Sequence, residues 1–330
     1  MSKFASDLAS AVKEDLFKSG IFGGIGNVYI VCRTANTAAF AELNRKFGGL
    51  TYDDGSAILY PATTAAADLA INAALSSCVL HRGDYVVLMP DDGNYTLTAT
   101  IAMSKKGVHL IGLGNMANLG CMNLCRLDAR GKAFHAITTS SGGIEIAGIY
   151  INTATDYYGI YCTDGSVSGY GLNIHHNRVH VYTSATGTGG GIVCSGAAAG
   201  GYSNFDSNVI LVGTGAASAA VAGISVPNGT FPVITNNYVM AQNGCTVAIG
   251  INASGTGGLV AYNIIHERAV EGASTAGVFT LGINLSTSAL AVGNRIGIAI
   301  TGSSFGGGTA SVGFVLNYDS TTNGGTLLNG

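Results

Sequence analysis

The chain has 330 residues, of which 47% are apolar and only 10% charged, with 50 glycines and 4 prolines. A typical soluble domain has about 25% charged residues, so this surface is poor in charge. The net charge of −3, without a basic run, excludes a general attraction to nucleic acid or to an anionic membrane. Seven cysteines without a CxxC pair predict buried, reduced thiols, and we expect no metal and no cofactor.

The first twenty residues predict a short amphipathic helix. Charged residues such as Lys3, Asp7 and Lys13 leave no apolar core for a signal peptide, so we expect synthesis in the cytoplasm of a host and no export. The apolar stripe of this helix consists of Phe4, Leu8, Val12 and Leu16. A glycine-rich joint and a strand follow, and we assign residues 1–60 to an N-terminal anchoring segment, a short α/β arm that docks on another subunit or on its own chain.

Residues 63–80 predict a second helix, which would cover the open end of the domain that follows. Thr63 or Thr64 would cap its start. Its expected apolar face consists of Leu69, Ile71, Leu75 and Val79. A turn and a buried strand over residues 85–89 follow, and residues 107–115 predict the next strand.

From residue 140 onward the chain repeats itself about every thirty residues. A glycine followed by an apolar residue recurs at positions 159, 191, 223, 250, 282 and 313. An asparagine after an alternating apolar stretch recurs with the same period, at Asn177, Asn208, Asn237, Asn263 and Asn294. Such a fixed period is typical of solenoid proteins.

Each repeat has the two-residue alternation of a strand and no helical spacing. A strand that returns after about thirty residues without a helix must stack in parallel on its predecessor at ~4.8 Å. We therefore predict an all-β fold, a single-stranded parallel β-helix over residues 61–330, with about eight coils. Inward ladders would place Cys162 beside Cys194, continued by Val226, Ala253 and Leu285. The five asparagines would form a structural hydrogen-bonded ladder.

Two resemblances agree with this fold. "GDYVVLMPDDGNY" and "GVHLIGLG" resemble segments of the right-handed parallel β-helix proteins of the pectate lyase-like class, over residues 60–320. "LFKSGIFGGIGNVYIV", "DDGSAILYPATTAAADLAINAA" and "RGDYVVLMPDDGNYTL" resemble a group of virion structural proteins of tailed bacteriophages, over the first 115 residues. The second resemblance implies a virion location and an architecture, and it carries no functional site.

The stretch "GLNIHHNRVH" contains three of the seven histidines within six positions. Alignment of the coils places His175 beside Asp206 on the next coil, and Glu145 one coil below Asn173. Two carboxylates on one face suit an inverting glycosidase, in which one acts as acid and the other as base. A zinc site is disfavoured, because at most two ligands converge near either outer histidine.

Aromatic residues near these histidines suggest contact with a glycan or with another subunit. The candidates for glycan contact are Tyr157, Tyr158, Tyr182 and Arg178. A polyuronate lyase is disfavoured, because residues 133–266 contain a single arginine to stabilise a substrate carboxylate.

One outward strip is apolar and predicts self-association. It consists of Val209, Leu211, Tyr238, Met240 and Ile264. Because monomers rarely expose such a strip, we expect a second copy to cover it, in a parallel homotrimer.

The sequence thus favours a non-enzymatic phage virion structural protein, a capsid-associated decoration whose partners are its own copies and capsid or tail subunits. The chief alternative is a tail fibre or spike that cleaves host polysaccharide with Glu145, Asp206 and His175. A third is a glycan-binding module that uses the tyrosines without cleavage. Nucleic acid and membrane are not expected partners.

Overall fold

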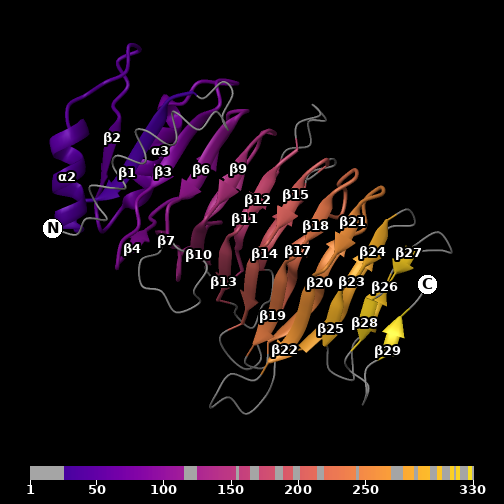
Figure 1. Ribbon diagram of the computed structural model, residues 1–330. Helices are drawn as coiled ribbons and strands as arrows, with labels where there is room; N and C mark the ends of the chain where they lie inside the picture. The colour runs from indigo at the N-terminus through magenta and orange to yellow at the C-terminus, as the bar shows by residue number, and fades with distance from the viewer. Residues whose placement is uncertain are drawn as a thin grey trace.

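The computed structural model describes residues 26–114, 125–153, 156–163, 171–182, 189–195, 201–213, 219–242, 245–268, 278–285 and 289–297, with short strands at 303–306, 313–315, 317–319 and 326–328. Parallel strands in three sheets wind into a right-handed parallel β-helix (Figure 1). Among the described pairs of named strands only β28 with β29 is antiparallel. The predicted all-β solenoid is therefore confirmed.

Sheet 1 has eleven strands, in spatial order β2 (Leu59–Ala62), β1 (Val28–Arg33), β3 (Asp84–Leu88), β6 (Val108–Gly112), β9 (Glu145–Ala147), β12 (Asn173–His175), β15 (Asn204–Asp206), β18 (Val233–Thr235), β21 (Leu259–Ala261), β24 (Leu290–Val292) and β27 (Gly313–Val315).

Sheet 2 has ten strands, in spatial order β4 (Asn94–Thr96), β7 (Cys125–Asp128), β10 (Ile149–Thr153), β13 (Arg178–Val181), β16 (Val209–Val212), β19 (Tyr238–Gln242), β22 (Ile264–Arg268), β25 (Arg295–Gly297), β28 (Asn317–Asp319) and β29 (Thr326–Leu328).

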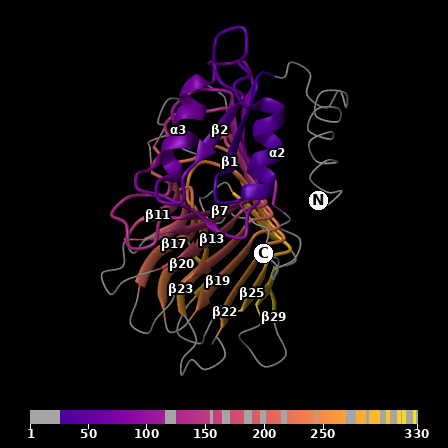
Figure 2. The ribbon, with the colours of Figure 1, turned by 90° about the vertical axis from the view of Figure 1, so that its left-hand side faces the viewer.

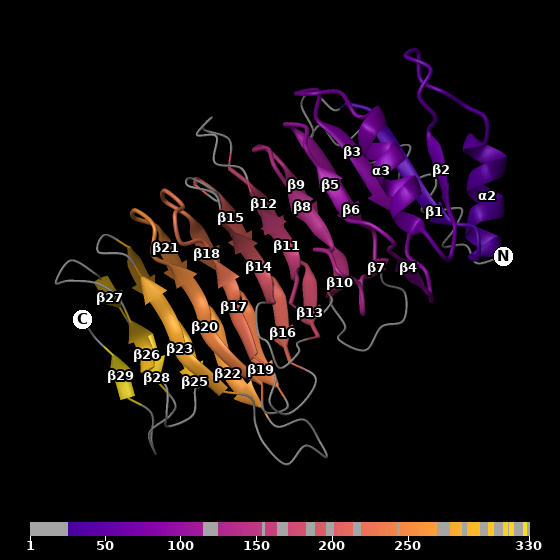
Figure 3. The same cartoon turned by 180° about the vertical axis from the view of Figure 1, so that it is seen from behind.

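Sheet 3, seen from behind in Figure 3, has eight strands, in spatial order β5 (Ile101–Met103), β8 (Ile137–Thr139), β11 (Tyr158–Cys162), β14 (Gly190–Cys194), β17 (Ala219–Ser225), β20 (Thr246–Ala253), β23 (Val278–Leu285) and β26 (Ser303–Gly306). One coil visits sheets 1, 2 and 3 in turn, from β3–β4–β5 to β24–β25–β26.

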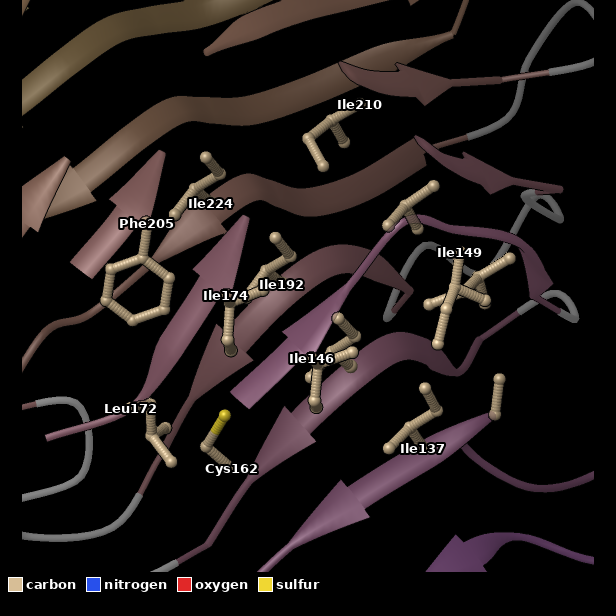
Figure 4. Packing of buried hydrophobic residues seen from close by; sticks show 14 of the residues in the cluster. Ile137, Ile146, Ile149, Cys162, Leu172, Ile174, Ile192, Phe205, Ile210 and Ile224 are labelled. Atoms are coloured by element: carbon tan, nitrogen blue, oxygen red, sulfur yellow. The ribbon is translucent and has the colours of Figure 1, made fainter. Parts of the chain in front are cut away.

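The inward side chains of the three sheets form one continuous core. Ile146, Ile174 and Phe205 point inward from sheet 1 toward residues of sheet 3 such as Ile192 (Figure 4). Cys162 lies directly opposite Cys194, and both are fully buried. Ala253 pairs with Leu285 in the same way, so the predicted inward ladder is confirmed.

A two-residue turn joins sheet 1 to sheet 2 in successive coils. Its first position has a positive φ at Gly148, His176, Ser207, Asn236, Tyr262 and Gly293. Its second position holds the five asparagines of the repeat, all at least 99% buried. The left-handed conformation turns the chain sharply, and the next side chain then points into the corner of the coil.

The asparagine side chains hydrogen-bond one another from coil to coil. Asn208 Oδ1 accepts from both the backbone N–H and Nδ2 of Asn177, each at 3.1 Å. Asn177 Nδ2 also donates to the carbonyl oxygen of Ile146 at 2.8 Å. The same pattern continues to Asn294. In the coil before Asn177 the ladder position is Ile149, whose backbone N–H donates to Asn177 Oδ1 at 3.2 Å.

Two helices pack on opposite faces of the first strands of sheet 1 (Figure 2). Helix α2 (Thr37–Phe47) joins β1 to β2 and packs on outward residues such as Ile30 and Cys32. Helix α3 (Ala67–Ser77) joins β2 to β3 and packs on the inward Tyr29 and Val31. The connection from β1 to β2 through α2 and the connection from β2 to β3 through α3 run in opposite directions along the sheet. Because parallel connections of this kind are right-handed, the two helices lie on opposite faces. Neither helix of the described residues is long and apolar enough to cross a membrane.

The second predicted helix exists, but its limits and apolar face differ from the prediction. It runs from Ala67 to Ser77 within the predicted 63–80, and neither Thr63 nor Thr64 is its N-cap, which is Ala66. Leu69 is 67% exposed and Val79 43% exposed, so both were wrongly assigned to the apolar face.

The buried face of α3 contains Ala67, Ile71, Ala74 and Leu75. Ile71 and Leu75 of the predicted apolar face are therefore confirmed as buried.

The described part of the predicted anchoring segment, residues 26–60, is continuous with the β-helix. β1 pairs with β3, and β2 extends the same sheet. Whether this segment anchors the chain on another subunit stays a prediction. The stripe of Phe4, Leu8, Val12 and Leu16 lies outside the described residues.

The asparagine ladder gives the first testable prediction. Asn237→Ala removes the acceptor of two donors of Asn208 and a donor to the carbonyl oxygen of Phe205, all buried. We expect a loss of about 2–4 kcal/mol in the free energy of unfolding, measured by denaturant titration. Asn228→Ala, at an exposed position after β17, is the control and should cost less than about 1 kcal/mol. Equal losses would contradict the role of the ladder.

Candidate functional site

The outer face of sheet 1 changes in chemistry along the axis of the β-helix. At its N-terminal end, α2 covers the face. Polar and titratable side chains follow on β6, β9, β12 and β15. Beyond them, β18, β21 and β24 present mainly apolar side chains. The polar zone contains the carboxylates that the sequence analysis selected as catalytic candidates.

Glu145 lies at the centre of this polar zone, between histidines of the two adjacent strands. His175 Nε2 is 2.8 Å from Glu145 Oε1, at hydrogen-bond distance. His109 Nδ1 is 3.2 Å from Glu145 Oε2, within ion-pair distance, although its ring is not aligned for a hydrogen bond. Tyr85 stacks on His109 with ring centroids 4.4 Å apart. Each carboxylate oxygen therefore has an imidazole neighbour.

A second histidine extends this contact toward solvent. His175 Nδ1 lies 2.9 Å from Nδ1 of His176, so one ring donates and the other accepts. His176 occupies the left-handed turn position, with φ of 53°, and is exposed. When His175 donates from Nε2 to Glu145, its Nδ1 accepts from His176. The result is a chain from carboxylate to imidazole to imidazole that ends at the surface.

The two histidines stabilise the charged form of Glu145. Interactions with His109 and then His175 outweigh the effect of burial and lower the pKa of Glu145 to about 2. Its carboxyl group is therefore ionised throughout the ordinary pH range and does not hold a proton to donate.

Asp206 has a different set of partners from the one expected. His175 stands opposite Asp206 in the strand register, but its ring turns toward Glu145 on the preceding coil. The predicted placement of His175 beside Asp206 is confirmed by the strand register, but the His175 side chain contacts Glu145 instead of Asp206. The reason is competition, because Asp206 already accepts hydrogen bonds from Ser207, Thr235 and Asn236, at 2.7, 2.7 and 2.8 Å.

These hydrogen bonds also set the charge of Asp206. Burial raises its pKa, but the bonds from Thr235, Ser207 and Asn236 outweigh burial and leave the pKa below its ordinary value. An inverting glycosidase needs one carboxylic acid with a raised pKa as proton donor. Neither Glu145 nor Asp206 has that property.

His109 belongs to this cluster and was not selected from the sequence. It is an outward residue in "GVHLIGLG", two coils before His175 in sheet 1. Its alternation with buried Val108 and Leu110 marks it as outward, and its strand register places it opposite Glu145. In the described part of the chain, no three His, Cys, Asp or Glu side chains are arranged to hold a metal ion.

The four candidates for glycan contact separate onto two sheets. Tyr157 and Tyr158 lie at sheet 3, where Tyr158 stacks on His135 with ring centroids 4.8 Å apart. Arg178 and Tyr182 lie at sheet 2. Whether these residues contact a glycan stays a prediction.

The predicted apolar strip of sheet 2 is only partly accessible. Leu211 is 6% exposed and Met240 5%, whereas Ile264 is 38% exposed. Val209 and Tyr238 are half-buried. The strip follows the predicted strand register, but its two central members are covered within the chain itself, so they offer little surface to a second copy.

A more exposed apolar surface lies on sheet 1, and the sequence analysis did not select it. We call it the sheet 1 apolar face, formed by Val233, Leu259 and Leu290 and flanked by Tyr202, Phe231 and Tyr262. The flanking rings are 52–62% exposed. Tyr202 and Phe231 lie just before β15 and β18, and Tyr262 lies just after β21.

No family model and no curated protein matches the chain. Similar solved structures include the A-module of a mannuronan C-5 epimerase of Azotobacter vinelandii, 12% identical, with a TM-score of 0.28, covering 79% of this chain and 97% of that chain. They also include ORF18 of Geobacillus virus E2, 11% identical, with a TM-score of 0.33, covering 89% of this chain and 74% of that chain. Likeness at this level says nothing about activity or partners.

The low pKa of Glu145 gives a second prediction. The native state holds Glu145 ionised at a lower pH than the unfolded chain does, so this contribution to stability is present above about pH 4.5 and is lost toward about pH 2. We expect Glu145→Gln to be less stable than wild type at neutral pH, with the difference shrinking across that window. Chemical unfolding at a series of pH values measures it, and a pH-independent difference would contradict the stabilisation of the Glu145 carboxylate by the two histidines.

Proposed function

We propose that this chain is a non-enzymatic structural subunit of a virion, a capsid-associated decoration that acts by assembly. The observation that carries the proposal is the sheet 1 apolar face, because soluble monomers rarely expose contiguous apolar surface without a partner. The sequence resemblance to tailed-phage virion structural proteins supports the location. The partners proposed are further copies in a parallel homotrimer and neighbouring capsid or tail subunits.

The backbone of the flanking aromatic residues supports a contact role. Tyr202, Phe231 and Tyr262 have φ of 51–57°, a conformation that costs a non-glycine residue about 1–2 kcal/mol. The positions equivalent to Tyr202 and Phe231 in other coils include Gly143 and Gly257, both with φ of 67°. Exposed aromatic rings at such positions contribute little to the core, and they fit a surface that is covered on assembly.

The charge state of the carboxylates supports a role without catalysis. Glu145 is engaged by two histidines, and Asp206 by three hydrogen-bond donors. Both pKa values are lowered, which removes the proton donor that the tail-spike alternative requires.

The assembly surface is tested with substitutions that suit its backbone. Phe231→Asn and Tyr262→Asn remove exposed rings and place asparagine, which tolerates the left-handed conformation. We expect unchanged or slightly higher thermal stability. We also expect weaker self-association, with a dissociation constant at least tenfold higher, measured by light scattering. Leu69→Asn, at an exposed leucine of α3, is the matched control. A wild-type chain that stays monomeric at all concentrations would overturn the homotrimer.

The absence of catalysis is tested with host-type surface polysaccharides. The purified chain is expected to release no reducing ends from them over hours of incubation. Release by the wild type that Glu145→Gln or Asp206→Asn abolishes would overturn the structural role and establish the depolymerase alternative.

A further inference from the structure

Helix α3 carries no charge on its solvent side, although the described residues cover only its inner face. The inner face packs on inward side chains of sheet 1 such as Tyr29 and Val31. The single charged residue of the helix, Asp68, is 1% exposed and accepts hydrogen bonds from the backbone N–H and the hydroxyl of Thr98. Asn72 bonds to the backbone of β5 and its preceding residue. A helix without a charged face is typically buried on all sides.

The exposed residues of α3 and of the segment after it form an apolar surface. Leu69, Ala73 and Ser76 share one side of the helix, with the spacing i, i+4, i+7. Val79 and Leu80 follow its C-terminal end. Leu69 is 67% exposed, Val79 43% and Leu80 51%. We call these five residues the α3 outer row.

Helix α2 shows that the missing charge is a property of α3 and not of every helix in this charge-poor chain. The solvent side of α2 includes Asn44 and Arg45. Glu42 forms ion pairs with Arg45 and Lys46, at 2.9 and 3.1 Å. This is the ordinary polar face of a helix that lies in water. The α3 outer row therefore suits an apolar cover better than α2 does.

A hollow of about 190 Å³ lies beside the α3 outer row, between α3 and strands β5 and β6. Ser76 belongs to its lining, and its apolar floor consists of Leu75, Met103 and Val108, all at least 95% buried. Sites for small molecules typically enclose about 300–1,000 Å³. The smaller volume here suits a large apolar side chain from a segment that lies on the row.

The described chain begins beside this surface. The backbone N–H of Gly26 donates to the carbonyl oxygen of Gly83 at 3.1 Å. The carboxylate of Asp84 accepts from the backbone N–H of Asn27 at 2.7 Å and from that of Val79 at 2.6 Å. One carboxylate thus holds the start of the described chain next to a member of the α3 outer row.

The sequence before Gly26 contains an apolar stripe that can reach the α3 outer row. The stripe, which lies outside the described residues, consists of Phe4, Leu8, Val12 and Leu16. Residues 17–25 connect it to Gly26 and can extend over ~30 Å. The eleven residues of α3 are only ~16 Å long. The connection is therefore long enough for the stripe to lie anywhere on the row.

We propose that residues 4–16 dock on the α3 outer row of the same chain, with the apolar stripe over Leu69, Val79 and Leu80 and one large side chain in the hollow. The occupant belongs to the same chain because the connection through Gly26 keeps the stripe beside the row at an effective concentration of about millimolar. The contact is separate from the sheet 1 apolar face and does not rest on the proposed function. Substitution of Leu69 therefore leaves self-association through sheet 1 unchanged.

Hydrogen exchange of the full chain, followed by mass spectrometry on peptides from residues 4–16 and 67–80, tests the docking. We expect the amides of residues 4–16 to exchange at least about tenfold more slowly than in the unfolded chain, at every protein concentration. An isolated helix shorter than ~12–15 residues is marginal in water, so such slow exchange requires docking. Leu69→Glu and Leu80→Glu should each bring the exchange to within about twofold of the unfolded rate, because a charge then faces the stripe.

Leu50→Glu is the matched control, at a leucine after α2 that is 51% exposed, as Leu80 is. It should leave the exchange of residues 4–16 unchanged. Leu8→Glu should speed exchange in residues 67–80, and adding Leu69→Glu to it should have no further effect, because the contact is lost only once. Unprotected amides in residues 4–16 of the wild type, protection that rises with protein concentration, or an equal effect of Leu50→Glu would each overturn the proposal.

Discussion

The hydrogen bonds between asparagine side chains of successive coils are the constraint on which the rest of this structure depends. They close the turn between sheets 1 and 2, where the chain bends within two residues and its backbone donors would otherwise be buried without acceptors. They also lock each coil in register with the next. Every outward side chain therefore has a defined neighbour above and below, and the contacts of Glu145 with His175 and of Tyr150 with two arginines follow from that alignment.

The coils, the inward ladder and the asparagine column were predictable because each is encoded by one residue type at one period. Contacts on the outer faces were not, since they depend on how side chains rotate. His175 was placed beside Asp206 by register alone, yet it turns to Glu145, whose oxygens were less occupied. Likewise, the burial of Leu211 depends on what covers an outward position, and alternation carries no information on that.

The three outer faces carry different chemistry on one invariant interior. Sheet 1 changes from a helix-covered end through a polar zone to an apolar face, while sheet 2 begins with arginine and tyrosine. A solenoid allows this division because outward residues contribute little to the core, so substituting them changes the stability of the fold only slightly. Sequence neighbours are therefore poor guides to a shared site, as the separation of Tyr158 from Arg178 shows.

The parallel strand pairing has a mechanical consequence. The hydrogen bonds between strands of neighbouring coils run along the axis, and, apart from the chain that passes from one coil to the next, these bonds and the packing of inward side chains hold the coils together. A pull along the axis therefore loads the coil junctions in series, and the rod yields at its weakest junction. A push along the axis closes the same junctions against side chains that are already in contact. The molecule is thus built to bear compression better than tension, which favours attachment along its flank over suspension from its ends.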